Sequence, residues 1–402
     1  MLKVPKLPQF VRTWLRFRVV EQILYGTDIV KATLTGRQQA LLKVLLVGDD
    51  AVYTSEQQFA PLLANRDGFR EQLGVVFHYK LLSDALLLSR RVLQHYDVVG
   101  FKLGFRSSPA EVLSAARTIK SALAPGAKLV YFDGDDDLGV QWPNLLPLVD
   151  LYLKKHCYRD LSEYRKNRIG KSNLTDYCAR KFGINFENDI IPTTAPVDEE
   201  QLSKIMLSWN IGLDDKIHQF YNTHRILPAA SSKDIDVVCR ATVSQESWIY
   251  PLRSLVIPEI KPLGRDYRVL TPDQRVAQDV YYQEMLRSRI CVSPFGYGEI
   301  CWRDFEAVLC GCVLVKPDMS HVDTQPNIFI PNETYVPVLW DYSDLRSTLT
   351  QLLAQPERCE RLRTNAFGVL RDYFEGNGII QSFQHILRSL GVASAGFQTA
   401  GK

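Results

Sequence analysis

The sequence lacks several patterns that would place it at once in a class of proteins. No run of about 18 uncharged apolar residues occurs, so no membrane-spanning helix is expected. The formal net charge of +3 is too small for the strongly basic face of a nucleic-acid-binding protein, and no nucleic-acid partner is expected. The eight cysteines include no CxxC pair and lie mostly in apolar runs, which is typical of reduced thiols in an intracellular protein.

What is present is the composition of an ordinary globular protein. Apolar residues make up 46% of the 402 positions and charged residues 23%, and this length suits two domains better than one. Periodicity is lost over residues 226–233, which we interpret as an interdomain linker. The expected division is a basic N-terminal helix region (1–39), a first domain (40–225), the linker (226–233), a second domain (234–390) and a disordered tail (391–402).

The N-terminal region has an excess of positive charge. Seven Lys/Arg and only two acidic residues occur among the first 40 positions, and residues 8–24 place large apolar side chains near one helical face. Such a basic amphipathic helix could lie on an anionic membrane surface or dock on its own domain. Both readings are compatible with a cytoplasmic protein, and the first would make it peripheral at the inner membrane face.

Short apolar runs that end in polar residues predict buried strands in both halves of the chain. In the first half these runs are 40–47, 96–101, 128–132 and 149–153, and in the second half 235–239, 290–293 and 313–315. Helices are expected between them. One begins at Ser108, where a serine, a proline at the next position and Glu111 form a capping pattern. Alternating strands and helices predict an α/β fold with two Rossmann-like domains.

Ligands of open α/β sheets bind beyond the carboxyl ends of the strands, so polar residues directly after the predicted strands are candidate site residues. Four such places are the acidic loop 133–137, the basic loop 154–156, Arg240 and the long loop 294–302. The long loop is the most informative. Its glycines permit a tight turn and a close approach to a ligand, and the helix that follows offers free N–H groups to a phosphate.

Arg303 and Glu306 share one face of this helix. An arginine there can hold a diphosphate through bidentate hydrogen bonds, and a glutamate one turn later can accept from the hydroxyls of a ribose. The alternative is that the two side chains pair with each other on a surface helix.

The whole segment from Ser293 to Val315, SPFGYGEICWRDFEAVLCGCVLV, resembles the donor-site signature of GT-B glycosyltransferases, especially the exostosin-like and CgeB-like groups. The resemblance implies two Rossmann-like domains facing across a cleft and transfer of a sugar from a UDP- or GDP-sugar donor. It also implies a glycan or lipid-linked acceptor, as in polysaccharide biosynthesis, and no cofactor or obligatory metal. In that family the arginine contacts the diphosphate and the glutamate the ribose, which implies these roles for Arg303 and Glu306.

The donor-binding residues expected on these grounds are Arg240, Ser293, Gly296, Gly298, Glu299, Arg303, Glu306 and Lys316. One departure from the family pattern concerns the glutamates. Retaining members commonly have two glutamates eight positions apart, whereas Glu299 and Glu306 are seven apart and Gly298 occupies the matching place. The stereochemical outcome is therefore left open.

Three residues are candidates for a catalytic base. Asp133 and Asp135 lie in the acidic loop, where like charges raise a carboxylate's pKa, and His156 follows a predicted strand. The acidic loop could instead bind acceptor hydroxyls or be a solvated turn, and His156 could be structural. A divalent cation on these carboxylates is chemically allowed but is not expected.

Two other enzyme or signalling classes fit less well. The run 43–50 is similar to the start of a phosphoacceptor receiver domain, but that leaves the second α/β half unexplained. A nicotinamide dehydrogenase needs GxGxxG after a first strand, and neither half has it. The remaining alternative is a non-catalytic protein of the same fold that binds a nucleotide sugar or a glycan.

Overall fold

The computed structural model describes residues 41–49, 53–88, 90–186, 195–210, 215–241, 247–272 and 275–392. The expected basic helix within 1–39, including its membrane contact at 8–24, and nearly all of the expected tail lie outside these ranges. The chain divides into two compact units. The first contains residues up to Gly134, Asn144–Leu153 and the segment from Ile380, and the second contains Asp135–Pro143 and Lys154–Ile379.

This division differs from the one expected from the sequence. Residues 154–225 belong with the second unit, and the chain beyond Ile380 returns to the first. Phe383 explains the return, because its ring packs against Phe69 and Phe77 of the first unit at 5.5 and 5.1 Å. The segment interpreted as a linker is tied to the second unit, since the carbonyl of Pro228 accepts a hydrogen bond from Arg363 at 2.6 Å.

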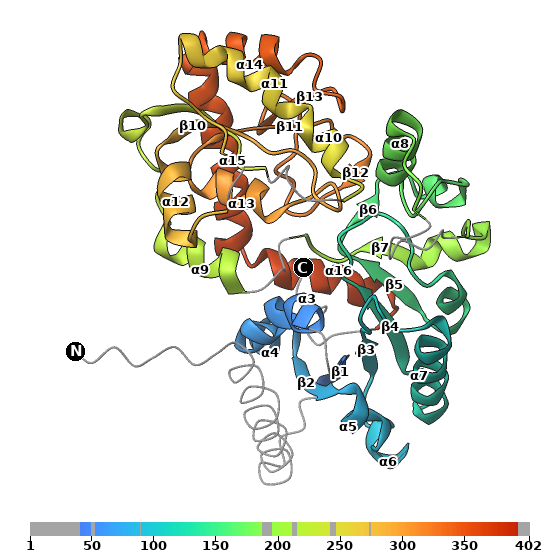
Figure 1. Ribbon diagram of the computed structural model, residues 1–402. Coiled ribbons are helices and arrows are strands. Elements are labelled where there is room, and N and C mark those ends of the chain that lie inside the picture. Colours follow the sequence, from blue (N-terminus) through green and yellow to red (C-terminus); the bar gives the residue numbers. More distant parts are fainter. Residues whose placement is uncertain are drawn as a thin grey trace. The chain divides into compact units, whose positions relative to one another are not determined.

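The first unit is built on a sheet whose strands lie in the order β2-β1-β3-β4-β5 (Figure 1). The strands are β1 (Leu42–Gly48), β2 (Val75–Leu81), β3 (Val98–Phe101), β4 (Lys128–Asp133) and β5 (Leu151–Lys154). The helices are α3 (Tyr53–Ala64), α4 (Arg66–Leu73), α5 (Leu82–Leu86), α6 (Arg90–Leu93), α7 (Pro109–Ala122), the 3-10 turn η2 (Pro143–Leu148) and α16 (Gly378–Ser389). The pairings of β1 with β2 and β3, and of β3 with β4, are parallel.

The start of α7 follows the predicted capping pattern. Glu111 N–H donates to Ser108 Oγ at 3.3 Å, and Ser108 N–H donates back to the Glu111 carboxylate at 2.7 Å. The bonds that the Glu111 carboxylate accepts from Ser108 N–H and from Ser108 Oγ lower the pKa of Glu111. The bond from Glu111 N–H to Ser108 Oγ satisfies a helix N–H group that has no partner within the helix. A serine cap of this kind contributes about 1 kcal/mol.

The second unit is built on a parallel sheet in the order β13-β11-β10-β8-β9. Its strands are β8 (Ile235–Val238), β9 (Val269–Leu270), β10 (Ser288–Val292), β11 (Val313–Pro317) and β13 (Tyr335–Val338). Every neighbouring pair in this order is parallel. A short antiparallel pair, β6 (Cys157–Tyr158) with β12 (Val322–Asp323), and the strand β7 (Ile205–Leu207) also belong to this unit.

Helices occupy connections between these strands and also follow the last strand, β13 (Figure 1). The α-helices are α8 (Asn173–Phe182), α9 (Asp215–Thr223), α10 (Tyr250–Ser254), α11 (Val256–Ile260), α12 (Gln278–Leu286), α13 (Trp302–Leu309), α14 (Leu345–Leu353) and α15 (Pro356–Glu375). The 3-10 turns are η3 (Leu161–Arg165), η4 (Glu199–Lys204), η5 (Ala230–Ser232) and η6 (Lys261–Arg265). The predicted α/β class, with a Rossmann-like parallel sheet in each half, is confirmed.

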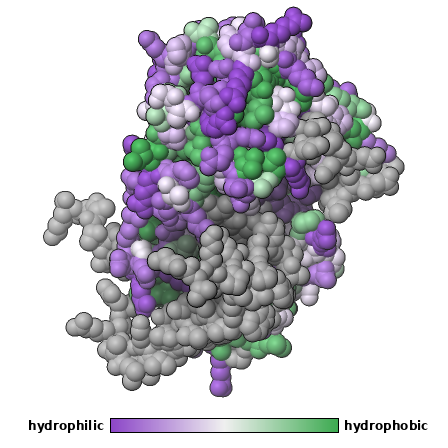
Figure 2. All heavy atoms as spheres, turned by 60° about the vertical axis from the view of Figure 1, so that its left-hand side comes forward, coloured by the Kyte–Doolittle hydropathy of each residue, from purple (hydrophilic) through white to green (hydrophobic). Residues whose placement is uncertain are grey.

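The strands are buried because their sequences are almost entirely apolar, as parallel strands covered on both faces require. All five residues of β11 are buried, and so are all four of β3. On the one face drawn in Figure 2, the described surface is mostly hydrophilic, with hydrophobic residues in small groups. Burial of apolar side chains therefore drives the formation of each sheet. Some polar side chains of the second unit are buried as well, among them Glu306 and Lys316, and these belong to the candidate site.

Candidate active site

The order of strands in the second unit contains a switch point between β8 and β10. From β8 the chain adds β9 on one side, and it then crosses to add β10, β11 and β13 on the other. Loops that leave the two central strands in opposite directions open a crevice at their carboxyl ends, where α/β proteins bind ligands. Arg240 follows β8 and Ser293 follows β10, so both predicted site residues lie at this switch point.

Arg303, in the first turn of α13, joins the two strand ends. Its Nε donates to Ser293 Oγ at 3.0 Å, and its two terminal nitrogens donate to the carbonyls of Arg240 and Pro294, both at 2.8 Å. These bonds use three of the five N–H groups of the guanidinium. The side chain therefore links the segments that follow β8 and β10, and two of its N–H groups remain for other partners.

Glu306, one turn further along α13, is 3% exposed. Its two carboxylate oxygens accept hydrogen bonds from the hydroxyls of Tyr281 and Tyr282 in α12, both at 2.8 Å. Burial, and then the negative charge of Glu306, raise the pKa of both tyrosines. The alternative interpretation was that Arg303 and Glu306 pair with each other. They do not, because their side chains bind other groups.

The other predicted cations are engaged within the chain. The Arg240 guanidinium forms a salt bridge with Glu284, with Nη2 2.6 Å from Oε1. The Lys316 ammonium lies 3.1 Å from the Asp304 carboxylate, and both side chains are fully buried. Asp304 also accepts from Ser293 Oγ at 2.5 Å and from Cys301 N–H at 2.8 Å. Asp304 thus binds both ends of the loop after β10, and Lys316 compensates its charge.

The two predicted glycines shape the same loop. Gly296 N–H donates to the carbonyl of Gly298 at 2.9 Å, which closes a tight turn. A Cβ on Gly298 would overlap the carbonyl oxygen of Asp136, so only glycine fits there. The close approach that Gly298 permits in the structure is to the backbone of Asp136, which belongs to the same unit.

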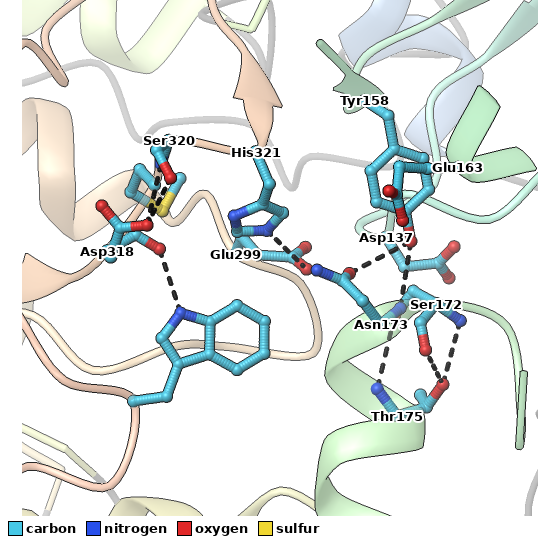
Figure 3. A network of polar contacts seen from close by, with 12 residues as sticks. Asp137, Tyr158, Glu163, Ser172, Asn173, Thr175, Glu299, Asp318, Ser320 and His321 are labelled. Carbon is cyan, nitrogen blue, oxygen red and sulfur yellow. Dashed lines mark hydrogen bonds and ion pairs between the residues drawn. The ribbon is translucent and has the colours of Figure 1, made fainter. Parts of the chain in front are cut away.

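Glu299, the next residue, is completely buried, and neither of its carboxylate oxygens has a hydrogen-bond partner among the described residues. His321 lies beside it, with Nε2 3.6 Å from Oε1. Figure 3 shows the imidazole and the carboxylate pointing toward one another, with Tyr158 and Asn173 nearby.

The predicted bases lie in different surroundings. Asp133 ends β4 in the first unit, where its carboxylate accepts from the Tyr152 hydroxyl at 3.0 Å and is 2% exposed. Asp135 and His156 belong to the second unit, and His156 is 1% exposed. The carboxylates beside Asp135 are neutralised, because Asp136 pairs with Lys155 at 2.6 Å and Asp137 with Lys171 at 3.3 Å.

The described part of the chain holds neither a cluster of metal ligands nor a membrane-spanning helix. In that part of the chain His, Cys, Asp and Glu side chains nowhere gather in threes as a metal site requires. Over the same residues, no helix is both long enough and apolar enough to cross a bilayer.

Sequence reasoning missed four residues that shape the site: Tyr281, Tyr282, Asp304 and His321. The tyrosines gave no signal, because a helix in the preceding connection reaches Glu306 only through tertiary packing. His321 carried a usable signal. It lies four residues beyond β11, among the strand-end positions where ligand-binding residues gather.

Comparisons by sequence and by structure give different results. No family model and no curated protein sequence matches this chain. Among solved structures, the chain is similar to UDP-GlcNAc 2-epimerase from Neisseria meningitidis bound to UDP-GlcNAc, with 11% identity, a TM-score of 0.43, and 86% of this chain and 100% of that one covered. It is also similar to a glycosyltransferase from Rickettsia africae, with 8% identity, a TM-score of 0.45 and coverages of 87% and 99%.

A third similar structure is the pneumococcal O-GlcNAc transferase GtfA in complex with UDP and GlcNAc. Its identity is 12% and its TM-score 0.37, with 76% of this chain and 58% of that one covered. At such identities and TM-scores these likenesses assign no activity to this chain, and the case for a function rests on the side chains at the switch point.

Proposed function

We propose that this protein is a glycosyltransferase that transfers a sugar from a UDP- or GDP-sugar to a hydroxyl of a glycan or lipid-linked acceptor. The observation that carries the proposal is the position of the segment Ser293–Val315 in the fold. The segment resembling a donor-site signature runs from the switch point of the parallel sheet through α13, where α/β proteins bind ligands.

The chemistry of the side chains supports a nucleotide-sugar donor. A glutamate carboxylate such as that of Glu306 is the type of group that accepts hydrogen bonds from ribose hydroxyls, and Arg303 retains two N–H groups for a diphosphate oxygen. In this proposal the leaving diphosphate is stabilised by these N–H groups and by the backbone amides that begin α13, with no obligatory metal. The base roles expected from the sequence for Asp133, Asp135 and His156 remain predictions.

A second candidate is a non-catalytic nucleotide-sugar-binding protein of the same fold. One observation favours it: the three cationic side chains expected at the diphosphate, Arg240, Arg303 and Lys316, are all engaged within the chain. Binding through Glu306 and backbone amides would survive this arrangement, whereas stabilisation of a leaving diphosphate would be weaker.

The test combines binding with turnover. Calorimetry with a panel of UDP- and GDP-sugars measures donor affinity, and release of the free nucleotide measures turnover. We expect Glu306→Ala to weaken donor binding by about 10- to 100-fold, because hydrogen bonds to a charged group contribute about 1.5–3 kcal/mol. Glu357→Ala, an exposed residue of α15, is the matched control and should bind as the wild type does.

The outcomes separate the candidates. Binding with turnover supports the transferase, and binding that never leads to nucleotide release with any acceptor supports the non-catalytic protein. Absence of binding to every donor, or wild-type affinity in Glu306→Ala, would remove the proposed site.

A further inference from the structure

A buried carboxylate without a hydrogen-bond partner is costly unless something compensates its charge. Glu299 is 0% exposed, and both its oxygens lack a hydrogen bond within the described part of the chain. The groups whose pKa it raises are neutral side chains. Burial and then the charge of Glu299 raise the pKa of the Cys178 thiol to about 12, and the same two causes raise the pKa of the Tyr158 hydroxyl.

His321 is the group that can share a proton with this carboxylate. Its Nε2 is buried and lies 3.6 Å from Glu299 Oε1, while 20% of the side chain is exposed. The imidazole therefore connects the buried carboxylate with the surface of the second unit. With Nε2 turned to Glu299, Nδ1 is the nitrogen that can meet a substrate.

The position of His321 is fixed by the backbone. Its carbonyl accepts a hydrogen bond from Arg159 N–H at 2.9 Å, and the next residue, Val322, pairs with Tyr158 in the β6–β12 ribbon. The ring also lies against two aromatic side chains, with centroid distances of 5.3 Å to Trp340 and 6.5 Å to Tyr158. A ring held from several sides is suited to a fixed role in proton transfer.

The pair lies on the same edge of the sheet as the proposed donor site. Glu299 follows β10, His321 follows β11, and Trp340 follows β13, and these three strands are parallel neighbours. The carboxyl ends of parallel strands meet at one edge. Arg303 and Glu306 lie near that edge too, because the loop after β10 leads directly into α13, the helix that carries them.

We propose that His321 is the catalytic base of the transfer and that Glu299 orients and stabilises its imidazole. The inference rests on the proposed function and adds the proton acceptor to it. The acceptor oxygen forms a bond to C1 of the donor sugar while the bond from C1 to the diphosphate oxygen breaks. The diphosphate leaves with the electron pair, and the acceptor proton moves to Nδ1 of His321. A carboxylate behind the imidazole holds its tautomer and stabilises the imidazolium that forms.

This assignment makes the reaction a single displacement, so the anomeric centre of the transferred sugar inverts. It also distinguishes His321 from the bases expected from the sequence. His156 is 1% exposed and Asp133 is 2% exposed with its carboxylate bonded to Tyr152, whereas His321 has an exposed edge and a carboxylate behind it.

The experiment uses the full chain with the UDP- or GDP-sugar that gives the highest rate of nucleotide release. His321→Ala should lower kcat by about 100-fold or more, the usual contribution of a general base, and leave donor affinity unchanged. Added imidazole should restore part of the rate, because the space left by the ring has access to solvent. Glu299→Gln should lower kcat without imidazole rescue. His224→Gln, a similarly half-buried histidine stacked on Phe220, is the matched control and should keep the wild-type rate.

A pH–rate profile adds a readout that a structural histidine would not change. The loss of rate at acid pH should be present in the wild type and absent in His321→Ala. The ionisable groups that face the pair are Tyr158 and Cys178, and Arg168 and Asp137 act on Tyr158 in turn.

The two levels of failure are distinguishable. If the wild type transfers sugar with retention of configuration, or if His321→Ala keeps its rate, the roles proposed for His321 and Glu299 are wrong and the transferase proposal stands. If no donor binds or is turned over by the wild type, the proposed function is wrong, and the roles proposed for His321 and Glu299 are wrong as well.

Discussion

The ammonium of Lys316 lies 3.1 Å from the carboxylate of Asp304, and neither side chain is exposed to solvent. Lys316 is the last residue but one of the buried strand β11, and Asp304 lies in the first turn of the helix that follows the glycine loop. The pair therefore connects the sheet to the segment in which we place the donor. Its role is to hold that segment, and the ligand contact expected for Lys316 from the sequence remains a prediction.

Removing one partner of this pair should be severe. Lys316→Met leaves the Asp304 charge buried and uncompensated, and we expect a loss of about 3–5 kcal/mol in the free energy of unfolding. The double variant Lys316→Met/Asp304→Leu should recover only part of it, because Ser293 Oγ and Cys301 N–H then lose their acceptor. Urea denaturation measures both, and equal stability of the single variant and the wild type would show that the pair does not form.

Gly298 should tolerate no side chain. A Cβ there would overlap the carbonyl oxygen of Asp136, so Gly298→Ala must displace either the glycine loop or the acidic loop. We expect a clear fall in both melting temperature and donor affinity. Gly264→Ala is the control, because nothing lies within 4 Å of a Cβ at that position. Donor binding unchanged in Gly298→Ala would place the ligand elsewhere.

Thiol labelling should report on the donor site. Cys301, which begins the helix carrying Arg303, is half-buried, whereas the other seven cysteines are buried. Burial raises the pKa of Cys239 to about 11, which further slows its reaction. Iodoacetamide on the native protein should therefore modify Cys301 first, and a bound nucleotide sugar should slow that reaction. Mass spectrometry of tryptic peptides identifies the site, and labelling led by a buried cysteine would contradict the prediction.

Asp234 should make stability depend on pH at the acid end. Hydrogen bonds from Arg287, with help from Arg268, lower the pKa of this carboxyl to about 2. A carboxyl with a lowered pKa in the folded state stabilises the protein at pH values above its ordinary pKa of about 4, and the contribution is lost as pH falls toward 2. Asp234→Asn should flatten this part of the stability curve. Denaturation midpoints between pH 5 and 2 measure the difference, and parallel curves for the two proteins would rule out the effect.

Much of the fold followed from local patterns. The apolar runs at 128–132 and 313–315 are strands in the structure, and the Ser108–Glu111 pattern caps a helix, because burial and capping depend on residues close together in the chain. The strand β2 was not predicted, since His78 and Lys80 interrupt its apolar run. Their burial is decided by neighbouring elements that the local pattern does not contain.

The division into units was also beyond local patterns. Residues 154–225 belong to the second unit although they lie in the first half of the sequence, and most of α16 belongs to the first unit although it lies near the end of the chain. Their apolar side chains pack against residues far away in the sequence, as Phe383 does against Phe69. Loss of periodicity at 226–233 marks an irregular segment, and only contacts such as that of Pro228 with Arg363 show to which unit it is tied.

The sequence by itself determined that the segment after Ser293 is a strand end, a glycine turn and a helix bearing Arg303 and Glu306, because spacing along a helix decides which side chains share a face. Only the tertiary structure decided what those side chains do. It joined Arg303 to the strand ends, set two tyrosines against Glu306, and brought His321 to the buried Glu299. Strand order determines which loops meet at one edge of a sheet, and strand order is a property of the whole chain.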